Sequence, residues 1–235
     1  MKILAIDSSG IVASVAVVTD NELVSEYTIN YKKTHSQTLM PMIEEMNKSI
    51  ELDLKTIDSI AVAAGPGSFT GLRIGAATAK GLALALNKSI ISVPTLDGLA
   101  YNIYNKESLI CPIMDARRDQ VYTSIYKIKE NKLIKLTDYM ATDIKEILTK
   151  LKEYNKSVIF NGDGVSSFKE IIIRSELKEY SFAPVHLMKQ HASSVGALAI
   201  EYAKQGKIVS ANEFVPFYLR KSQAEREHEL KKKAE

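Results

Sequence analysis

Residues 3–9 read Ile-Leu-Ala-Ile-Asp-Ser-Ser, and this stretch decides the fold. Its apolar run predicts a buried strand, and the aspartate that ends the run, Asp7, predicts a turn. The pattern returns at 109–114, where a second apolar run ends in Asp115. Alternating segments that follow each aspartate predict a hairpin after each strand. The strand, aspartate and hairpin therefore occur twice, which predicts an α/β fold of two related halves.

The rest of the chain completes each half. Strands are predicted over 13–18, 23–30, 57–63, 90–93, 121–128, 133–139 and 157–160. Helices are predicted over about 34–50, 70–86, 143–154, 164–173 and 193–204, with one more after Pro94. The boundary falls near 105–108, which gives domains 1–106 and 107–235. The helix near 193–204 is left free to pack back on the first half, and 221–235 reads as a charged tail.

Composition narrows the class of protein. The chain has 235 residues, of which 46% are hydrophobic and 25% charged, as in ordinary globular proteins. A single cysteine, Cys111, excludes a disulfide framework and a cysteine-based zinc site. The first apolar run is too short for a signal peptide, so we expect a cytoplasmic protein without membrane association.

Charge divides unevenly along the chain. Residues 1–107 hold 9 basic and 11 acidic residues, a balance of −2, and residues 108–235 hold 22 and 17, a balance of +5. Neither half is basic enough to predict strong binding of nucleic acid by the chain alone.

The two aspartate turns predict an incomplete nucleotide-binding site, in which only the first turn has the residues to bind phosphate. An aspartate with hydroxyls after a buried strand can hold hydrated magnesium and phosphates, as Asp7, Ser8 and Ser9 could. Asp115 repeats the aspartate, but no glycine follows it to let backbone amides wrap a phosphate. A simple Asx-bonded turn at Asp7 remains the alternative.

The stretch Gly65-Pro-Gly-Ser-Phe-Thr-Gly71 is the most distinctive in the chain. It lacks the lysine of a P-loop and the third glycine of G-x-G-x-x-G. It predicts a strand-to-helix turn with hydroxyl caps, either as a structural elbow or with an anion at the helix N-terminus.

The residue patterns of two predicted helices indicate a surface that could contact another protein chain. Small residues recur every four positions from Gly71 to Ala83, and such a ridge packs closely on its own sheet or on a partner's helix. The segment 34–50 carries an apolar, methionine-rich stripe, and Thr34 and Gln37 stand at capping-box spacing. Together they favour an inter-chain interface. The predicted partner-binding residues are Leu39, Met42, Ile43, Met46, Gly71, Ile74, Gly75, Thr78, Ala79 and Leu82.

No catalytic constellation is visible. The four histidines are scattered without metal-ligand spacing, and Ser8, Ser9 and Ser68 lack a nearby histidine or a G-x-S-x-G elbow. We therefore predict no catalytic residue, no metal site and no cofactor.

Five stretches together resemble the TsaB family of bacterial tRNA threonylcarbamoyladenosine biosynthesis proteins. They are residues 3–9, 35–41, 65–75 (GPGSFTGLRIG), 114–118 and 216–220. The resemblance implies an actin/sugar-kinase/Hsp70-like (ribonuclease H-like) fold with mixed sheets flanked by helices. It implies a non-catalytic accessory subunit that supports the catalytic paralogue TsaD, with the ATPase TsaE. That complex transfers a threonylcarbamoyl group to N6 of the adenosine 3′ of the anticodon in tRNAs reading ANN codons.

The resemblance also implies roles for particular positions. Thr95 and Leu99 stand where the paralogue carries two metal-binding histidines, so that metal site is lost. Asp7, Ser8, Ser9 and Asp115 become a vestigial nucleotide site. The two helices of the first half become the docking surface on TsaD, with homodimers through the same helices when TsaD is absent. tRNA is bound only through the complex. The alternative is an active ATPase or kinase of the same fold, which magnesium-dependent ATP turnover would reveal.

Overall fold

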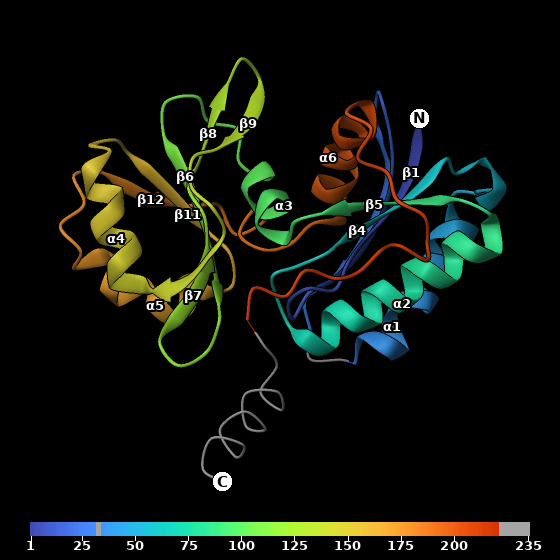
Figure 1. Cartoon of the computed structure of the whole chain (residues 1–235), viewed down its shortest axis with the longest axis horizontal. Coiled ribbons are helices and arrows are strands. Elements are labelled where there is room, and N and C mark those ends of the chain that lie inside the picture. Colours follow the sequence, from blue (N-terminus) through green and yellow to red (C-terminus); the bar gives the residue numbers. More distant parts are fainter. Residues whose placement is uncertain (32–33, 221–235) are drawn as a thin grey trace, which may run out of the picture.

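The computed structural model describes residues 1–31 and 34–220, which form two lobes side by side (Figure 1). The strands are β1 (Lys2–Asp7), β2 (Ala13–Thr19), β3 (Leu23–Ile29), β4 (Ser59–Ala63), β5 (Ser89–Val93), β6 (Leu109–Asp115), β7 (Gln120–Thr123), β8 (Tyr126–Lys129), β9 (Lys132–Lys135), β10 (Met140–Asp143), β11 (Val158–Asn161) and β12 (Tyr180–Phe182). The helices are α1 (His35–Ser49), α2 (Phe69–Leu86), α3 (Thr95–Tyr101), α4 (Ile144–Glu153), α5 (Gly164–Ile173) and α6 (Ala192–Lys204), with a 3₁₀ turn η1 (Leu54–Thr56).

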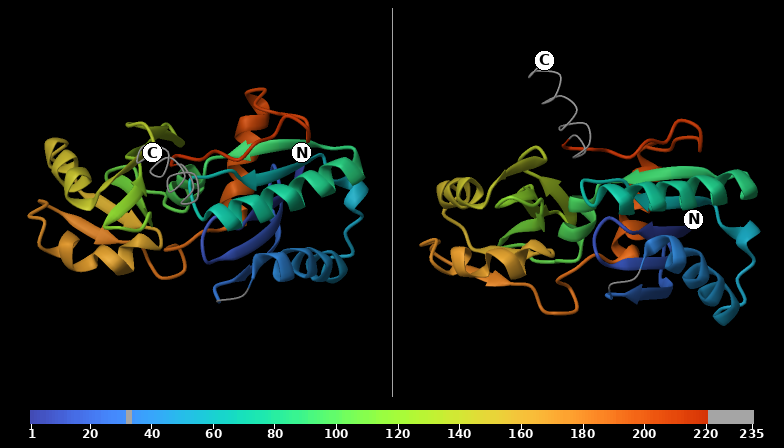
Figure 2. Two further views of the ribbon diagram at one scale, coloured as in Figure 1. Left: turned by 60° about the horizontal axis from the view of Figure 1, so that its bottom comes forward. Right: turned by 90° about the horizontal axis from the view of Figure 1, so that it is seen from below.

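The first sheet has the strand order β3-β2-β1-β4-β5. Strand β1 lies at its centre, antiparallel to β2 and parallel to β4. It is buried on both faces, which explains its continuous apolar run. Leu4 and Ile6 pack toward α1 and α2, whereas Ile3 and Ala5 pack toward α6 on the opposite face (Figure 2).

The second sheet repeats this plan. Its order is β10-β7-β6-β11-β12, and β8 pairs with β6 and β9. Strand β6 takes the place of β1, antiparallel to β7 and parallel to β11. Helices α4 and α5 cover one face through Ile147 and Phe168, and α3 packs on the other through Leu96 and Leu99. The predicted duplicated α/β fold, with mixed sheets flanked by helices, is confirmed.

Three local predictions are wrong. The strand expected over 121–128 is broken, because Ser124 Oγ donates to Thr137 O at 2.7 Å and Ile125 N donates to Thr137 Oγ1 at 3.0 Å. These bonds end β7 and start β8. The strand expected over 133–139 is shorter than predicted, because β9 ends at Lys135 and the next strand, β10, begins only at Met140. Thr34 occupies the N-cap position of α1, but its side chain makes no hydrogen bond to the helix. The predicted capping box therefore does not form.

Residues 192–214 lie with the first half although they follow the second half in the chain. Helix α6 packs on β1 and β2, where Val195 and Ala199 join the apolar cluster of Ile3. Val209 then forms an antiparallel bridge with Ile90. Helix α6 thus packs back on the first half, as the sequence left open, because the first sheet needs α6 to cover its second face. The charged tail predicted at 221–235 lies outside the described residues. Within the described ranges, no helix is long and apolar enough to cross a membrane.

Candidate functional site

The turn after β1 is closed by its own hydrogen bonds. Asp7 Oδ1 accepts from Ser9 N at 2.9 Å and from Ser9 Oγ at 2.6 Å. Asp7, Ser8 and Ser9 are all buried. Burial raises the pKa of the Asp7 carboxyl to about 6, although the Ser9 hydrogen bonds act in the opposite direction. This is the Asx-bonded turn that the sequence left as the alternative to a phosphate site.

The glycine loop between β4 and α2 lies directly on this turn. Ser68 N donates to Ser9 O at 2.7 Å, and Ser8 Oγ donates to Gly71 O at 2.9 Å. A Cβ at Gly67 would lie 2.3 Å from Ser9 O, and one at Gly71 would lie 2.1 Å from Ser8 O. Only glycine permits so close an approach of two backbones. The contacts support the structural-elbow interpretation of this loop.

The predicted partner-binding helices direct most of their named residues inward. Buried within the chain are Leu39, Met42, Ile43, Met46, Gly71, Gly75 and Ala79. A Cβ at Gly75 would already meet Ser8 Oγ at 2.4 Å. The prediction that Gly75 and Ala79 contact a partner's helix is therefore wrong, because both are buried within the chain. The four-residue spacing serves close packing of α2 on the β1–β2 turn and its sheet. Ile74, Thr78 and Leu82 are partly accessible.

The turn after β6 stays open. Asp115 Oδ1 accepts from Arg117 N at 2.7 Å, and the Arg117 guanidinium lies 3.8 Å from the other carboxylate oxygen. Arg117, Arg118 and Asp119 have φ values of 64°, 57° and 57°, in the left-handed region. Three consecutive non-glycine residues rarely adopt it. The turn presents the exposed cationic side chains of Arg117 and Arg118.

A C-terminal strap, residues 216–220, crosses from the first half to this open turn. Phe217 N donates to Ala64 O at 2.7 Å in the first half. At its other end, Arg220 Nη1 donates to Ala116 O at 3.0 Å in the second half. The sequence analysis singled out residues 216–220 only because they resemble the family. Nothing in their composition predicts that they connect the two halves.

A cavity of about 530 Å³ lies between the open turn, the glycine loop and the strap. Tyr218 forms part of its wall and stacks on Phe69 with 4.9 Å between ring centroids. Asp163 lines it too, and burial raises the pKa of its carboxyl. Of the predicted nucleotide-site residues, Asp115 lines the cavity, whereas Asp7, Ser8 and Ser9 do not. The structure therefore does not bring the four together in one accessible site.

Helix α3 braces the glycine loop. Thr95 Oγ1 accepts from Gly65 N at 3.2 Å, and Thr95 N donates to Gly65 O at 2.9 Å. Leu99 is buried in the cluster between α3 and the second sheet. Across residues 1–31 and 34–220, no three His, Cys, Asp or Glu side chains gather in a geometry suited to a metal ion. Both positions flagged from the sequence thus take part in packing.

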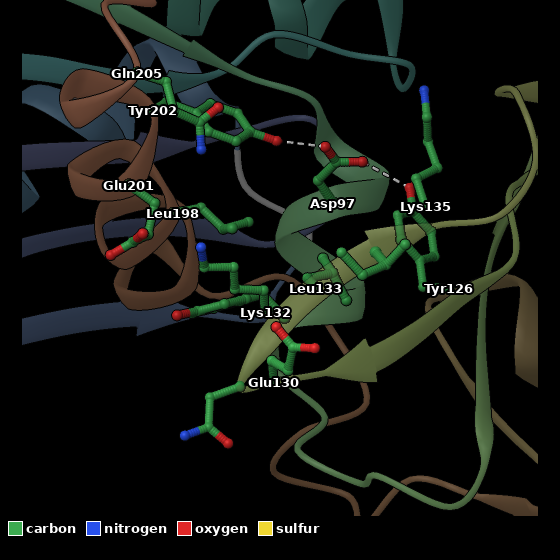
Figure 3. A pocket seen from close by; sticks show the side chains of 13 residues that line it. Asp97, Tyr126, Glu130, Lys132, Leu133, Lys135, Leu198, Glu201, Tyr202 and Gln205 are labelled. Atoms are coloured by element: carbon green, nitrogen blue, oxygen red, sulfur yellow. Dashed lines mark hydrogen bonds between the residues drawn. The ribbon is translucent and has the colours of Figure 1, made fainter.

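Asp97 on the same helix is the site residue that sequence reasoning missed (Figure 3). This buried carboxylate accepts from Tyr126 at 2.7 Å, from Tyr139 at 2.9 Å and from Tyr202 at 2.6 Å. Burial, and then the adjacent carboxylate, raises the pKa of all three hydroxyls, which keeps them protonated donors. The cluster ties α3 and α6 to the second sheet. No sequence spacing signals it, because its four members lie far apart in the chain.

The two mixed sheets, each with a central strand that ends in an aspartate turn, define the actin/sugar-kinase/Hsp70-like class of fold. The activator of the 2-hydroxyisocaproyl-CoA dehydratase from Clostridium difficile, solved with bound ADPNP, shares the fold. Its TM-score is 0.50 at 12% identity, over 88% of this chain and 97% of that chain. YeaZ from Pseudomonas aeruginosa superposes with a TM-score of 0.80 at 24% identity, over 93% and 99%.

Sequence comparison gives the family. Residues 22–228 match the family described as "TsaD: tRNA N6-adenosine threonylcarbamoyltransferase". The tRNA threonylcarbamoyladenosine biosynthesis protein TsaB of Bacillus subtilis (strain 168) is 35% identical over 225 residues, which cover 96% of each chain. The chain therefore belongs to the TsaB family, and the resemblance seen in its motifs is confirmed.

Proposed function

We propose that the chain is a non-catalytic accessory subunit of the complex that transfers a threonylcarbamoyl group to N6 of the adenosine 3′ of the anticodon in tRNAs reading ANN codons. It binds and supports a TsaD-like catalytic paralogue and acts with a TsaE-like ATPase. The identity to the Bacillus subtilis protein and the match to the TsaD family support this pathway.

The sealed turn after β1 is the observation that carries the accessory role. A phosphotransferase of this class grips its nucleotide between two strand–aspartate turns. Here the glycine loop covers Asp7, and the Asp7 side chain is committed to Ser9. Activating the site would require the loop to leave the turn, which breaks the backbone bond from Ser68 to Ser9. The packed positions Thr95 and Leu99 support the same conclusion for the paralogue's metal site.

Docking on the paralogue through α1 and α2 remains part of the proposal, with a corrected surface. The outward side chains are the ones that can reach a partner. Ile74, Thr78 and Leu82 are partly accessible, and Met40 and Leu84 are exposed by 48% and 61%. The same face would serve a homodimer when the paralogue is absent.

An ATPase or kinase is the second candidate, and the cavity beside Asp115 favours it. Its volume of about 530 Å³ falls in the range of small-ligand sites. Magnesium-dependent ATP hydrolysis by the purified chain tests it. We expect no ATP hydrolysis above background. Magnesium-dependent hydrolysis over many turnovers, abolished by Asp115→Ala, would instead establish that the chain is an ATPase.

Reconstitution tests the proposed function directly. The chain, its TsaD-like and TsaE-like partners and tRNA are combined with the threonylcarbamoyl donor, and each protein is omitted in turn. We expect modified tRNA only with all three proteins, and none from the chain alone. Full modification without the chain would overturn the accessory role.

A docking variant locates the surface. Leu84→Asp replaces an exposed side chain, so the monomer should fold normally and lose binding to the TsaD-like partner. Ile173→Asp on α5, exposed by 48%, is the matched control and should bind as the wild type does. Normal binding by Leu84→Asp would move the interface away from α2.

A further inference from the structure

The β8–β9 hairpin projects from the second half (Figure 1). Its strand register places lysines on one face. Lys129 pairs directly with Lys132, and Lys127 with Ile134. Directly opposed residues of an antiparallel pair share a face. One face of the hairpin therefore carries Lys127, Lys129 and Lys132, which we call the lysine face. At the edge of this face, Lys132 also lines the pocket between the hairpin and α6 (Figure 3). The inner face, with Tyr126, packs toward α3.

The lysine face breaks a local rule of sheet stability. Like charges directly opposite each other destabilise a strand pair, and Lys129 faces Lys132. The single acidic residue of the hairpin, Glu130, lies 4.0 Å from Lys129 with both side chains largely exposed, so it offsets little. Residues 126–135 contain four lysines and one glutamate, a balance of +3 that equals the formal charge of the whole chain. A polyanion on this face would relieve the repulsion.

Beside the hairpin tip stands an exposed aromatic ring. Tyr104 is 65% exposed, and its hydroxyl donates to Asn131 Oδ1 at 2.6 Å. The Lys106 ammonium lies 5.7 Å from the ring centroid. Cations that follow a phosphate backbone, next to an aromatic platform for a base, are typical of RNA-binding surfaces. An acidic protein surface would use the lysines but has no need of the ring.

We propose that the lysine face, with Tyr104 beside it, contacts the phosphate backbone of the tRNA in the assembled complex. The proposal rests on the proposed function, which supplies tRNA as the nucleic acid. Three ammonium groups are too few for strong binding by the chain alone, because affinity grows with the number of phosphates neutralised. The hairpin thus adds to a larger surface that the partner subunits provide.

The test compares two triple variants in the reconstituted complex. One is Lys127→Gln, Lys129→Gln and Lys132→Gln. The matched control, Lys145→Gln, Lys150→Gln and Lys152→Gln on α4, removes the same charge from exposed positions of the same half. Binding of unmodified tRNA is measured from 0.05 to 0.3 M salt, with complex assembly checked by size-exclusion chromatography. We expect the hairpin variant to bind about tenfold more weakly at 0.1 M salt, with a salt slope shallower by roughly two to three.

The control variant should bind tRNA as the wild type does. A photo-crosslinking amino acid at Ile134 should also link to tRNA in the assembled complex. Unchanged affinity and slope in the hairpin variant would overturn the tRNA contact and leave the proposed function intact, the lysines then serving only to protect the edge strand β9. Loss of assembly with the partner subunits would show an acidic protein ligand and also overturn it. If the wild-type complex neither binds nor modifies tRNA, the proposed function fails as well.

Discussion

The turns after β1 and β6 carry an aspartate in the same place, yet one is sealed and the other is open. In each half a glycine turn presses on the strand end. A Cβ at Gly71 would lie 2.1 Å from Ser8 O, and a Cβ at Gly162 would lie 2.1 Å from Ile113 O. In the first half both close contacts, from Gly67 and Gly71, fall on the two residues after Asp7, whereas in the second half Gly162 and Gly164 approach the backbone of Ile113 and Asp115. The covered turn is thus the one whose residues after the aspartate are in contact with the glycine loop.

Substitution of the covering glycine should produce the largest effect. Gly71→Ala places a methyl group against the backbone oxygen of Ser8, which cannot move without disturbing β1. We expect a loss of about 3 kcal/mol in the free energy of unfolding, measured by urea denaturation. The added helix propensity of alanine, about 1 kcal/mol, offsets part of the clash.

Gly81→Ala is the control within the same helix. A Cβ at Gly81 meets nothing within 4 Å, so only the helix propensity changes, and stability should rise by about 1 kcal/mol. Equal effects of the two substitutions would show that the loop does not press on the turn.

The carboxyl of the sealed turn should give a pH-dependent effect almost as large. The pKa of Asp7 is about 6 in the folded chain, against an ordinary value of 3.8. Between about pH 4 and pH 6, the folded state therefore keeps a proton on Asp7 that the unfolded state has lost. Unfolding free energy should therefore fall as pH rises from about 4 to about 6, by about 3 kcal/mol in total. Asp7→Asn keeps an oxygen acceptor for Ser9 and removes the titration. At pH 7.5 it should be about 2–3 kcal/mol more stable than the wild type, with little gain at pH 4.

Asp115→Asn probes the open turn by the same measurement. Its side chain lies at the cavity, and an amide oxygen can still accept from Arg117. We expect a change within about 0.5 kcal/mol at pH 7.5. A gain as large as that of Asp7→Asn would erase the distinction between the sealed and open turns.

The cluster around Asp97 ties the two halves, and weakening it should have an intermediate effect. Tyr202→Phe removes one hydrogen bond to the buried carboxylate, at a cost of about 1.5–2 kcal/mol in unfolding free energy. Tyr101→Phe, in the same pocket but outside these bonds to Asp97, should change it by less than about 0.5 kcal/mol. Indistinguishable denaturation midpoints for the two variants would show that the Tyr202–Asp97 hydrogen bond does not stabilise the contact between the two halves.

The strap should contribute less than the Asp97 cluster. Arg220→Ala removes the bond to Ala116 O, with an expected loss of about 1 kcal/mol and faster amide exchange in residues 116–119. Arg174→Ala, whose pair with Glu170 is exposed on both sides, should leave stability and exchange in that turn unchanged. Unchanged exchange in Arg220→Ala would mean that the strap does not hold the open turn.

The duplicated fold was predictable because each central strand is buried on both faces and therefore reads as an apolar run that ends in aspartate. The candidate site was predictable only in part. Gly71 and Gly75 were singled out correctly as unusual, but their spacing fits a partner's helix as well as the chain's own turn. The broken strand at Ser124 was missed because its cause, Thr137, lies elsewhere in the sequence.

The sequence by itself determined the two halves, their helices and strands, and the family, because these follow from local periodicity and short motifs. The tertiary structure alone decided which residues face inward. The methionine-rich stripe of α1 packs in the core, and the glycine loop covers Asp7. Three tyrosines from distant parts of the chain donate hydrogen bonds to Asp97. The physical reason is that burial and hydrogen bonding across a cleft depend on contacts between segments far apart in the chain. Such contacts leave no repeating pattern in either segment.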